Sequence, residues 1–356
     1  AKSHRPDMPY RFQAVNGNYV NAYAFPGGSI AATRGIMLEL ESEDELAALM
    51  GHEIGHVNAR HFAERQAQGT LVDLVTATAT IAAGSKNAQY GELAQLVGGL
   101  GGGALLAHYS RDNEREADAL GLEYMHKAGY NPAGMADLME MLNSQSKSKP
   151  NTLEIMFSTH PMSSERLANT RQALQSTYKE SARRPLQKER HMDSTARLRA
   201  LKPAIAEQQK GESMLGQKKY DLAEGHLRQA LSLAPDDYPG LVLMAKTQMA
   251  MKRPNEAQPY LARAKAIYPS EAQASQLTGV AHLQLRQPDR ALAAFQEYDR
   301  LLPGNPNTTF LKGYSLEQMQ NRQAAAQEYN RYLQMTRQGN QAQHAYSRLQ
   351  GWGYVK

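Results

Sequence analysis

The chain has 356 residues, of which 41% are hydrophobic and 21% are charged, and it contains no cysteine. This length allows two or three domains, and the lack of cysteine excludes a fold held together by disulfide bonds. The formal net charge of +5 permits peripheral contact with a membrane surface or attraction to an acidic partner, but we expect no nucleic-acid partner. Because the sequence begins at Ala1 rather than Met, we expect a mature or trimmed product from which any signal peptide has been removed.

Residues 1–41 are predicted to form short strands and turns. The segment 9–15 alternates between apolar and polar residues, and the Asn16-Gly17 pair after it is typical of a hairpin turn. Further strands are expected over residues 19–25 and 29–34, so we expect a small antiparallel sheet. An exposed edge of this sheet could bind an extended polypeptide by strand addition, and the alternative is a sheet that only supports the helix after it.

Residues 50–57 read MGHEIGHV and contain the pattern H-E-x-x-H. On a helix, His52 and His56 lie one turn apart on the same face, so both imidazoles could bind one metal ion. Glu53 projects beside them, where it could take a proton from a water molecule at the metal. Zinc suits two neutral imidazoles and a carboxylate with a fourth position left for water. The alternative is a chance match on an amphipathic surface helix, so the rest of the chain has to decide.

The residues around this pattern favour a helix. Ser42 is predicted to be the N-cap, with Glu45 three residues later completing a capping box. Gly51 and Gly55 lie inside the predicted helix, where each costs about 1 kcal/mol relative to alanine. We therefore expect another helix to pack closely against these two glycines.

A third metal ligand has to come from elsewhere in the chain. The longer pattern H-E-x-x-H-x-x-G-x-x-H is excluded, because Ala59 and Phe62 occupy the positions of its glycine and third histidine. His61 falls nearly half a turn away from the face of the first two histidines, so we expect it at the surface. Glu114 and Asp118, in the run SRDNEREADALG, are one helical turn apart. Glu114 could bind zinc while Asp118 accepts a hydrogen bond from a ligand histidine, and the alternative is a charged, solvated helix face.

Residues 57–109 are expected to be mostly helical. The segment 70–107 contains an apolar stretch and a glycine-rich stretch, but neither reaches about 18 unbroken apolar residues, so we expect no membrane span there. We predict helices that pack over the metal site, with the glycine-rich stretch as a joint, so that the segment could act as a lid. A hairpin that touches a membrane is the alternative.

The segment 157–166 is predicted to contain a turn and the start of a helix. His160 precedes Pro161, and a residue in that position is disfavoured in helical geometry. We therefore place His160 in a turn ahead of a helix that starts near Ser163. Behind this helix, residues 176–203 are charged and lack large apolar residues, which indicates a partly helical, solvated linker.

From about residue 204 the sequence repeats with a period of 34 residues. In four sets of positions, similar residues recur every 34 residues: Pro235, Pro269 and Pro303; Ala223, Ala257, Ala291 and Ala325; Gly211, Ala245, Gly279 and Gly313; and Leu227, Leu261, Phe295 and Tyr329. This period predicts tetratricopeptide repeats, because each repeat has a small residue where helices touch, a large apolar residue and a proline at its end. Such repeats stack into a curved solenoid that docks a protein partner or an unfolded client, or that serves as a scaffold. Trp352 is expected to pack as a cap at the end.

The combination of H-E-x-x-H, S-R-x-x-E-x-x-A-D and His160-Pro161 resembles the zinc peptidase family of the CAAX prenyl endopeptidases and HtpX. The helical-repeat tail resembles the soluble periplasmic type of this family, so the resemblance covers nearly the whole chain. It implies one Zn²⁺ per chain and a periplasmic location. It also implies the following roles: His52, His56 and Glu114 as metal ligands, Glu53 as catalytic base, His160 and Arg166 near the metal, and Gly28, Ser29, Ile30 and Ala31 as the strand that binds substrate.

Three roles for His160 stay open. It could stabilise the oxyanion during peptide hydrolysis, or occupy the open zinc position as an inhibitory switch, and the resemblance favours these two. The third possibility is an ordinary surface histidine.

The sequence as a whole predicts a mainly α fold with a small antiparallel β-sheet. A zinc peptidase domain (1–175) is expected to lead through a charged linker (176–203) to an α-solenoid of tetratricopeptide repeats (204–356). We expect a zinc metalloendopeptidase that cleaves misfolded or stalled clients in outer-membrane protein quality control, with repeats that dock client or assembly machinery. The alternative is a chaperone-like binding or scaffold module with a latent, self-inhibited zinc site.

Overall fold

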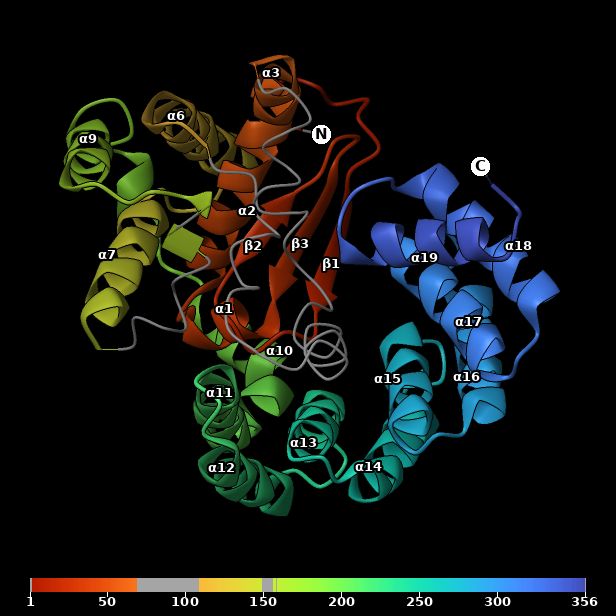
Figure 1. Cartoon of the computed structure of the whole chain (residues 1–356). Coiled ribbons are helices and arrows are strands. Elements are labelled where there is room, and N and C mark those ends of the chain that lie inside the picture. Colours follow the sequence, from red (N-terminus) through yellow and green to blue (C-terminus); the bar gives the residue numbers. More distant parts are fainter. Residues whose placement is uncertain (1, 69–108, 149–155, 158, 356) are drawn as a thin grey trace. The chain divides into compact units, whose positions relative to one another are not determined.

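The computed structural model describes residues 2–68, 109–148, 156–157 and 159–355 of the chain. It contains two compact units, whose boundary in the sequence lies between Gln209 and Lys210 (Figure 1). The mainly α class with a small sheet is confirmed. The predicted lid at 70–107 lies outside the described residues. No described helix is both long enough and apolar enough to cross a membrane.

Unit 1 contains the sheet and the helices around it. Its elements are β1 (Arg11–Val15), β2 (Ala22–Ala24), β3 (Ser29–Thr33), α1 (Arg34–Glu39), α2 (Glu43–Ala59), α3 (His61–Gln68), α6 (Arg111–Ala128), α7 (Ala133–Ser148), α9 (Ser164–Gln175), the 3-10 helix η1 (Ser181–Arg183) and α10 (Lys188–Ala200). Helix α11 (Lys202–Gly216) begins in unit 1 and ends in unit 2. A buried apolar cluster joins the sheet to α1, α2, α6 and α7, so the sheet and the first long helices share one core.

The three strands form a mixed sheet rather than the antiparallel sheet that we expected. Strand β3 lies in the middle, parallel to β1 and antiparallel to β2. The hairpin predicted at Asn16-Gly17 does not form, because β1 pairs with β3 and not with β2. The backbone of Gly17 forms one local and one long-range hydrogen bond. Its N–H donates to the carbonyl of Val15 at 2.8 Å, and its carbonyl accepts from the N–H of Gly35 at 3.1 Å.

The strand that we expected to bind substrate at its edge is the central strand. Ser29, Ile30 and Ala31 pair with β1, and Ile30 and Ala31 also pair with β2. The carbonyl of Gly28 accepts from the N–H of Arg11 at 3.0 Å. Strand addition at Gly28–Ala31 is therefore a wrong prediction, because the sheet itself already uses this strand's backbone groups. The edge strand that packs against α2 is β2.

Helices α2 and α6 approach each other at very short distance because glycines lie at their contact. A Cβ atom on Gly51 would lie 3.1 Å from the carbonyl oxygen of Gly121, and a Cβ on Gly55 would lie 2.9 Å from the Cα of Ala117. The close helix partner expected from Gly51 and Gly55 is thus confirmed. Figure 1 shows α6 lying beside α2.

Helix α2 begins where the sequence predicts. The side chain of Ser42 accepts a hydrogen bond from the N–H of Glu45 at 3.1 Å. The carboxylate of Glu45 accepts from the N–H of Glu41 at 2.7 Å, one residue earlier than in a standard capping box. Both contacts satisfy backbone donors near the start of the helix, which fixes where α2 begins.

Residues 176–203, predicted to be a partly helical, solvated linker, contain η1 and α10 and also contact earlier parts of unit 1. Helix α10 packs against α1 and α2. His191 is buried, with its Nε2 atom 3.2 Å from the carbonyl oxygen of Leu40. Asp44 of α2 accepts a hydrogen bond from the N–H of Gln187 at 2.6 Å. The helix and the exposure of most side chains agree with the prediction, whereas these contacts were not predicted, because they involve polar and backbone groups that an apolar pattern does not reveal.

Unit 2 is a stack of helix pairs. Its helices after α11 are α12 (Tyr220–Leu233), α13 (Tyr238–Ala250), α14 (Pro254–Ile267), α15 (Ala272–Gln284), α16 (Pro288–Leu301), α17 (Pro306–Gln318), α18 (Arg322–Met335) and α19 (Asn340–Gly351). The left-handed residues Lys218, Lys252, Arg286 and Gln320 recur at the same period in the turns within the pairs. The predicted solenoid of repeats is thereby confirmed.

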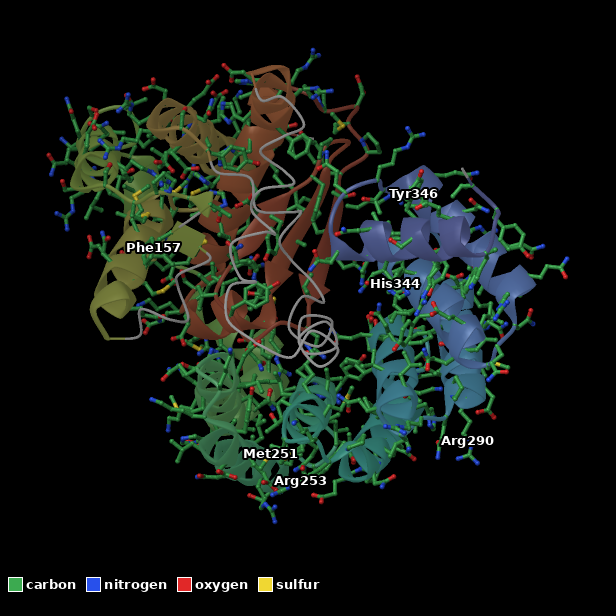
Figure 2. The ribbon with its side chains drawn as sticks, viewed as in Figure 1. Phe157, Met251, Arg253, Arg290, His344 and Tyr346 are labelled. Atoms are coloured by element: carbon green, nitrogen blue, oxygen red, sulfur yellow. The ribbon has the colours of Figure 1, made fainter. Side chains whose placement is uncertain are left out.

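The small residue of each repeat makes room for a large one. A Cβ on Gly279 would lie 2.4 Å from the ring of Phe295, and a Cβ on Gly313 would lie 2.7 Å from the ring of Tyr329. Phe295 and Tyr329 are fully buried. Trp352, directly after α19, closes the stack, since its ring stacks on Tyr329 with 6.2 Å between ring centroids. The cap predicted at Trp352 is thus confirmed. Figure 2 labels His344, which lies on α19.

Candidate metal centre

Four side chains from three segments of unit 1 converge in a buried cluster. His52 and His56 come from α2, Glu114 from the first turn of α6 and His160 from the turn before α9. Each offers one ligand atom, and these atoms all lie within 4.8 Å of one another. The structure therefore brings together the three predicted ligands and the histidine whose role was open. Burial excludes the view of Glu114 and His160 as solvated surface residues.

Four of the separations between these atoms lie close to those expected for the ligands of a tetrahedral metal ion. Zinc–ligand bonds of 2.0–2.1 Å at tetrahedral angles imply ligand–ligand separations of about 3.3–3.4 Å. The Nε2 atoms of His52 and His56 are 3.0 Å apart, and Nδ1 of His160 lies 3.4 Å from Nε2 of His52. Oε1 of Glu114 lies 3.3 Å from Nε2 of His56 and 3.1 Å from Nδ1 of His160. Three imidazoles and a carboxylate are also the donors that zinc prefers.

Glu53 lies next to the cluster, and no hydrogen bond joins its carboxylate to a described residue. Its side chain is fully buried, and neither carboxylate oxygen has a hydrogen-bond partner among the described residues. Its Oε1 atom is 3.7 Å from Nε2 of His160. A buried carboxylate without a partner is costly, so this position fits a group that meets a water molecule or a substrate at the metal.

Asp118 and Arg166 hold the first ligand histidine in place. Oδ1 of Asp118 lies 2.9 Å from Nδ1 of His52, as the one-turn spacing from Glu114 predicts. Arg166 donates to both oxygens of Asp118, from Nε at 2.6 Å and from Nη2 at 2.7 Å. Its Nη1 atom lies 2.6 Å from Oε2 of Glu114 and donates to the carbonyl of Pro161 at 3.0 Å. The guanidinium of Arg166 thus contacts Glu114, the Asp118 carboxylate that holds His52, and the turn that carries His160.

His61, expected at the surface, is buried against the second ligand histidine. Its Nδ1 atom lies 2.9 Å from Nδ1 of His56, and its Nε2 atom lies 3.3 Å from Oε2 of Glu116. The prediction is wrong because it extended α2 through residue 61. Arg60 adopts left-handed geometry with φ of 60°, so α2 ends at Ala59 and the chain turns back.

Tyr109 is a site residue that the sequence analysis missed. Its ring stacks on His56 with 3.9 Å between centroids and 19° between planes, and it is buried. Its N–H donates to the carbonyl of Thr159 at 3.2 Å, directly before His160. Tyr109 directly precedes the second motif, but a single tyrosine there carries no pattern that indicates contact with His56.

The charges in the cluster follow from burial and from close partners. Burial raises the pKa of Glu53 and holds the pKa of His56 well below its usual range. Burial would also raise the pKa of Glu114, but the charges and hydrogen bonds of the neighbouring histidines outweigh this effect and hold it well below its usual range. Burial would lower the pKa of His160, yet Glu114 and Glu53 raise it. A neutral His56 and an ionised Glu114 are the forms that bind a metal.

Comparisons with known proteins agree with this arrangement. The β-barrel assembly-enhancing protease of Escherichia coli is 32% identical over 165 residues, which cover 45% of this chain and 34% of that protein. The protein of the same name from Yersinia pestis is 27% identical over 324 residues, which cover 84% of this chain and 66% of that protein. Metalloprotease YcaL of Escherichia coli is 32% identical over 162 residues, which cover 44% of this chain and 59% of that protein.

Two family models also match the chain. Residues 1–174, which include all four members of the cluster, match the model described as Peptidase family M48. Residues 214–279 match the model described as Tetratricopeptide repeat. The chain therefore carries a domain of peptidase family M48 over residues 1–174, followed by tetratricopeptide repeats.

Proposed function

We propose that this chain is a zinc-dependent endopeptidase that cleaves misfolded or stalled polypeptides. The observation that carries the proposal is the buried cluster of His52, His56 and Glu114 with the unpartnered carboxylate of Glu53 beside it. The relatives named as β-barrel assembly-enhancing proteases favour clients from outer-membrane protein assembly. A periplasmic location, as the resemblance implies, belongs to this proposal.

The residues of the cluster divide the chemistry between them. When bound by His52, His56 and Glu114, one zinc ion would supply Lewis-acid polarisation of water and of the scissile carbonyl. Glu53 then takes the proton of the attacking water, and its raised pKa makes it a stronger base than an ordinary carboxylate. Glu53 returns this proton to the leaving amine. Asp118 and Arg166 keep His52 in the orientation that ligation requires.

His160 is proposed to act as a blocking ligand. Its Nδ1 atom lies 3.4 Å from Nε2 of His52 and 3.1 Å from Oε1 of Glu114, so it would offer a fourth ligand to a zinc ion held there and would take the position that water needs. Catalysis then requires the turn at His160 to move away from the metal. Once displaced, the imidazole could donate a hydrogen bond to the oxyanion, which is the role that competes with blocking.

An extended substrate is proposed to add to the sheet at β2. Strand β2 is the edge strand that packs against α2, the helix that carries two ligands. A strand added there would lie at the edge of the sheet that packs against this helix. This edge replaces Gly28–Ala31, whose backbone is paired on both sides.

The decisive experiment compares the wild-type chain with Glu53→Gln and with Glu140→Gln. Zinc content and cleavage of fluorescently labelled casein are measured on the same preparations. We expect about one zinc per chain in all three proteins, and cleavage reduced by roughly 10²–10⁴-fold only in Glu53→Gln. Glu140 is an exposed residue that pairs with Arg171, so its variant controls for the loss of a carboxylate. Cleavage retained in Glu53→Gln would refute the role of the base, and freshly purified protein without zinc would refute the metal site.

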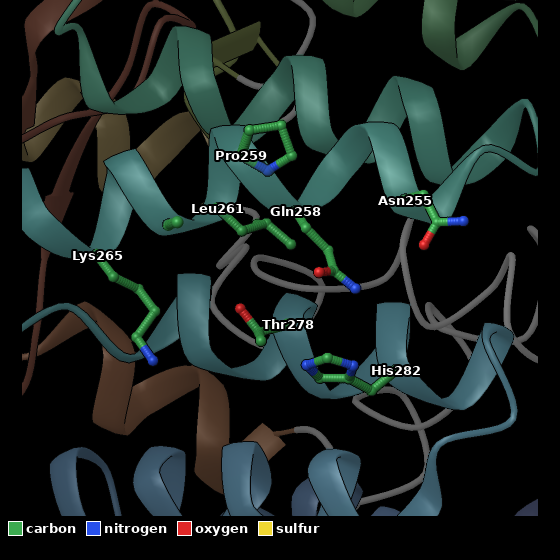
Figure 3. A pocket seen from close by; sticks show the side chains of 8 residues that line it. Asn255, Gln258, Pro259, Leu261, Lys265, Thr278 and His282 are labelled. Atoms are coloured by element: carbon green, nitrogen blue, oxygen red, sulfur yellow. The ribbon is translucent and has the colours of Figure 1, made fainter.

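The second candidate function is a binding module in which the zinc site stays blocked. A groove of about 620 Å³ between α14 and α15 favours it, and Figure 3 shows the polar groups of Gln258, Lys265, Thr278 and His282 around this groove. Such a lining suits the backbone and polar side chains of a docked polypeptide. The test is whether Glu53→Gln still suppresses the aggregation of an unfolded client. Suppression without cleavage in either the wild type or His160→Ala would favour the binding module.

A further inference from the structure

The two ligand histidines of α2 are supported in different ways. Nδ1 of His52 meets a carboxylate, since Oδ1 of Asp118 lies 2.9 Å away. Nδ1 of His56 meets another imidazole, since Nδ1 of His61 lies 2.9 Å away. Among the described residues, no other group forms a hydrogen bond with Nδ1 of His56. A ligand histidine usually donates to a carboxylate, a backbone carbonyl or water, so the imidazole partner is unusual.

The positions of the protons follow from the geometry. A neutral imidazole carries one N–H, and Nε2 of His56 faces the other ligand atoms with 3.0 Å to Nε2 of His52 and 3.3 Å to Glu114. The proton of a metal-bound His56 therefore lies on Nδ1 and is donated toward His61. The Nδ1 atom of His61 must then be the acceptor, which leaves the proton of a neutral His61 on Nε2. That N–H is directed at Oε2 of Glu116, 3.3 Å away.

We propose that His61 is a positioning residue of the metal centre, which accepts the Nδ1–H of His56 and thereby directs the Nε2 lone pair of His56 to the metal. This inference rests on the proposed zinc site and adds a supporting residue to it. The chain of hydrogen bonds runs from His56 through His61 to Glu116, whose side chain is 59% exposed. The support of His56 thus ends at the surface, whereas the support of His52 ends at a buried ion pair between Asp118 and Arg166.

The local backbone holds His61 in this place. Arg60 ends α2 in left-handed geometry, and α3 begins at the next residue, His61. This change of chain direction places the imidazole of His61 beside that of His56. The ring of Tyr109 stacks on His56 at 3.9 Å and limits how far this imidazole can rotate. His56 is therefore fixed by a stacked ring on its face and by an acceptor at its edge.

The test measures the zinc affinity of the full chain by competition with a chromophoric chelator. His61→Ala removes the acceptor, and we expect zinc affinity to fall by roughly 10–100-fold. His61→Asn restores an acceptor oxygen and an N–H donor of similar reach, so most of the affinity returns. The control is His4→Ala, because His4 also pairs with a carboxylate on α6, Glu123 at 2.7 Å, without touching the cluster. We expect no change in affinity for that variant.

The outcomes separate this inference from the proposed function. If the wild type binds zinc and His61→Ala binds it equally well, His61 has no positioning role, although the zinc site stands. An equal loss in His61→Ala and His61→Asn would also overturn the inference, because a restored acceptor should rescue a positioning role. A wild-type chain that binds no zinc would refute the proposed function first.

A spectroscopic measurement keeps the inference testable if His61→Ala fails to fold. Long-range ¹H–¹⁵N correlation spectra of the zinc-loaded wild type report which ring nitrogen of each histidine carries its proton. We expect His56 protonated at Nδ1 and His61 protonated at Nε2. A proton on Nδ1 of His61 would make it a donor and would overturn the inference.

Discussion

Gly55 of α2 lies so close to Ala117 of α6 that a methyl group on residue 55 would come within 2.9 Å of the Cα of Ala117. This contact lies between the two helices that carry His52, His56 and Glu114. Together with the contact between Gly51 and Gly121, this contact therefore sets both the separation of the helices and the position of Glu114 relative to the two histidines.

The first prediction is that Gly55→Ala weakens both the fold and the metal site. The added methyl group must push α2 and α6 apart, which we expect to cost about 1–3 kcal/mol of unfolding free energy. Zinc affinity should fall in parallel, because Glu114 moves away from the two histidines. Gly225→Ala is the matched control, since nothing lies within 4 Å of a Cβ there and alanine favours the helix. An unchanged zinc affinity in Gly55→Ala would show that the cluster tolerates a wider helix separation.

The second prediction concerns His160, whose Nδ1 atom lies 3.1 Å from Glu114 and 3.4 Å from His52. If it blocks the fourth position at the metal, His160→Ala should raise basal cleavage of casein several-fold while zinc content stays near one per chain. His4→Ala provides the control for the loss of an imidazole. A clear fall in kcat with unchanged zinc content would instead assign the imidazole to the oxyanion.

The third prediction concerns the stability of the repeats. Phe295 is fully buried and fills the space that Gly279 leaves open, so Phe295→Ala should cost about 3–5 kcal/mol of unfolding free energy. The fluorescence of Trp352 can follow this unfolding, because it is the single tryptophan of the chain and belongs to unit 2. Arg290→Ala, an exposed change on the same helix (Figure 2), should leave stability nearly unchanged. A loss below about 1 kcal/mol for Phe295→Ala would contradict the packing described for the repeats.

The fourth prediction is a pH dependence of the repeat unit that arises from Glu317. Burial alone would raise the pKa of Glu317, but hydrogen bonds from His344 and Tyr329 and the charges of His344 and Arg348 outweigh it and lower the pKa below its usual 4.5. Oε2 of Glu317 lies 3.1 Å from His344 and 2.6 Å from Tyr329, and Oε1 lies 2.7 Å from Arg348. A lowered pKa in the folded state means that the stabilisation is present above pH 4.5 and is lost as the pH falls through the folded-state value.

The measurement compares urea unfolding of the wild type and Glu317→Gln, followed by Trp352 fluorescence. The wild type should be more stable than the variant at pH 7, and the difference should shrink as the pH is lowered through the range below 4.5. Glu256→Gln, whose carboxylate lies on α14 in the same unit, is the control. A difference that stays constant with pH would rule out Glu317 as the origin of the pH dependence.

The repeats were predictable because each depends on local spacing. The small residue at 279 and the large one at 295 lie sixteen positions apart in one helix pair, and the same pair recurs down the chain. The spacing of His52 and His56, and that of Glu114 and Asp118, was readable for the same reason, since one helical turn fixes each pair. Those positions could be read without any knowledge of the rest of the fold.

Other parts of the site could not be predicted because they depend on long-range contacts or on one dihedral angle. The order of the strands follows from the pairing of Arg11 with Ser29, which is not a hairpin contact. The position of His61 follows from the left-handed φ angle of Arg60. Arginine rarely adopts this geometry, so the sequence does not indicate a turn there. Tyr109 reaches His56 from a segment that shares no pattern with it.

Arg166 gives the proposed blocked state a further property. The same guanidinium contacts the ligand Glu114, the support Asp118 and the carbonyl of Pro161, which follows the blocking histidine. If the turn at residues 160–161 moves away from the metal, the hydrogen bond between Arg166 and the carbonyl of Pro161 must break, or Arg166 must move with the turn. A movement of Arg166 would also displace Glu114 and Asp118. If the proposed blocking role holds, activation and metal retention are coupled, and an opened enzyme should lose zinc to a chelator faster than a closed one. The rate of zinc loss would then report how often the site opens, even when no substrate is present.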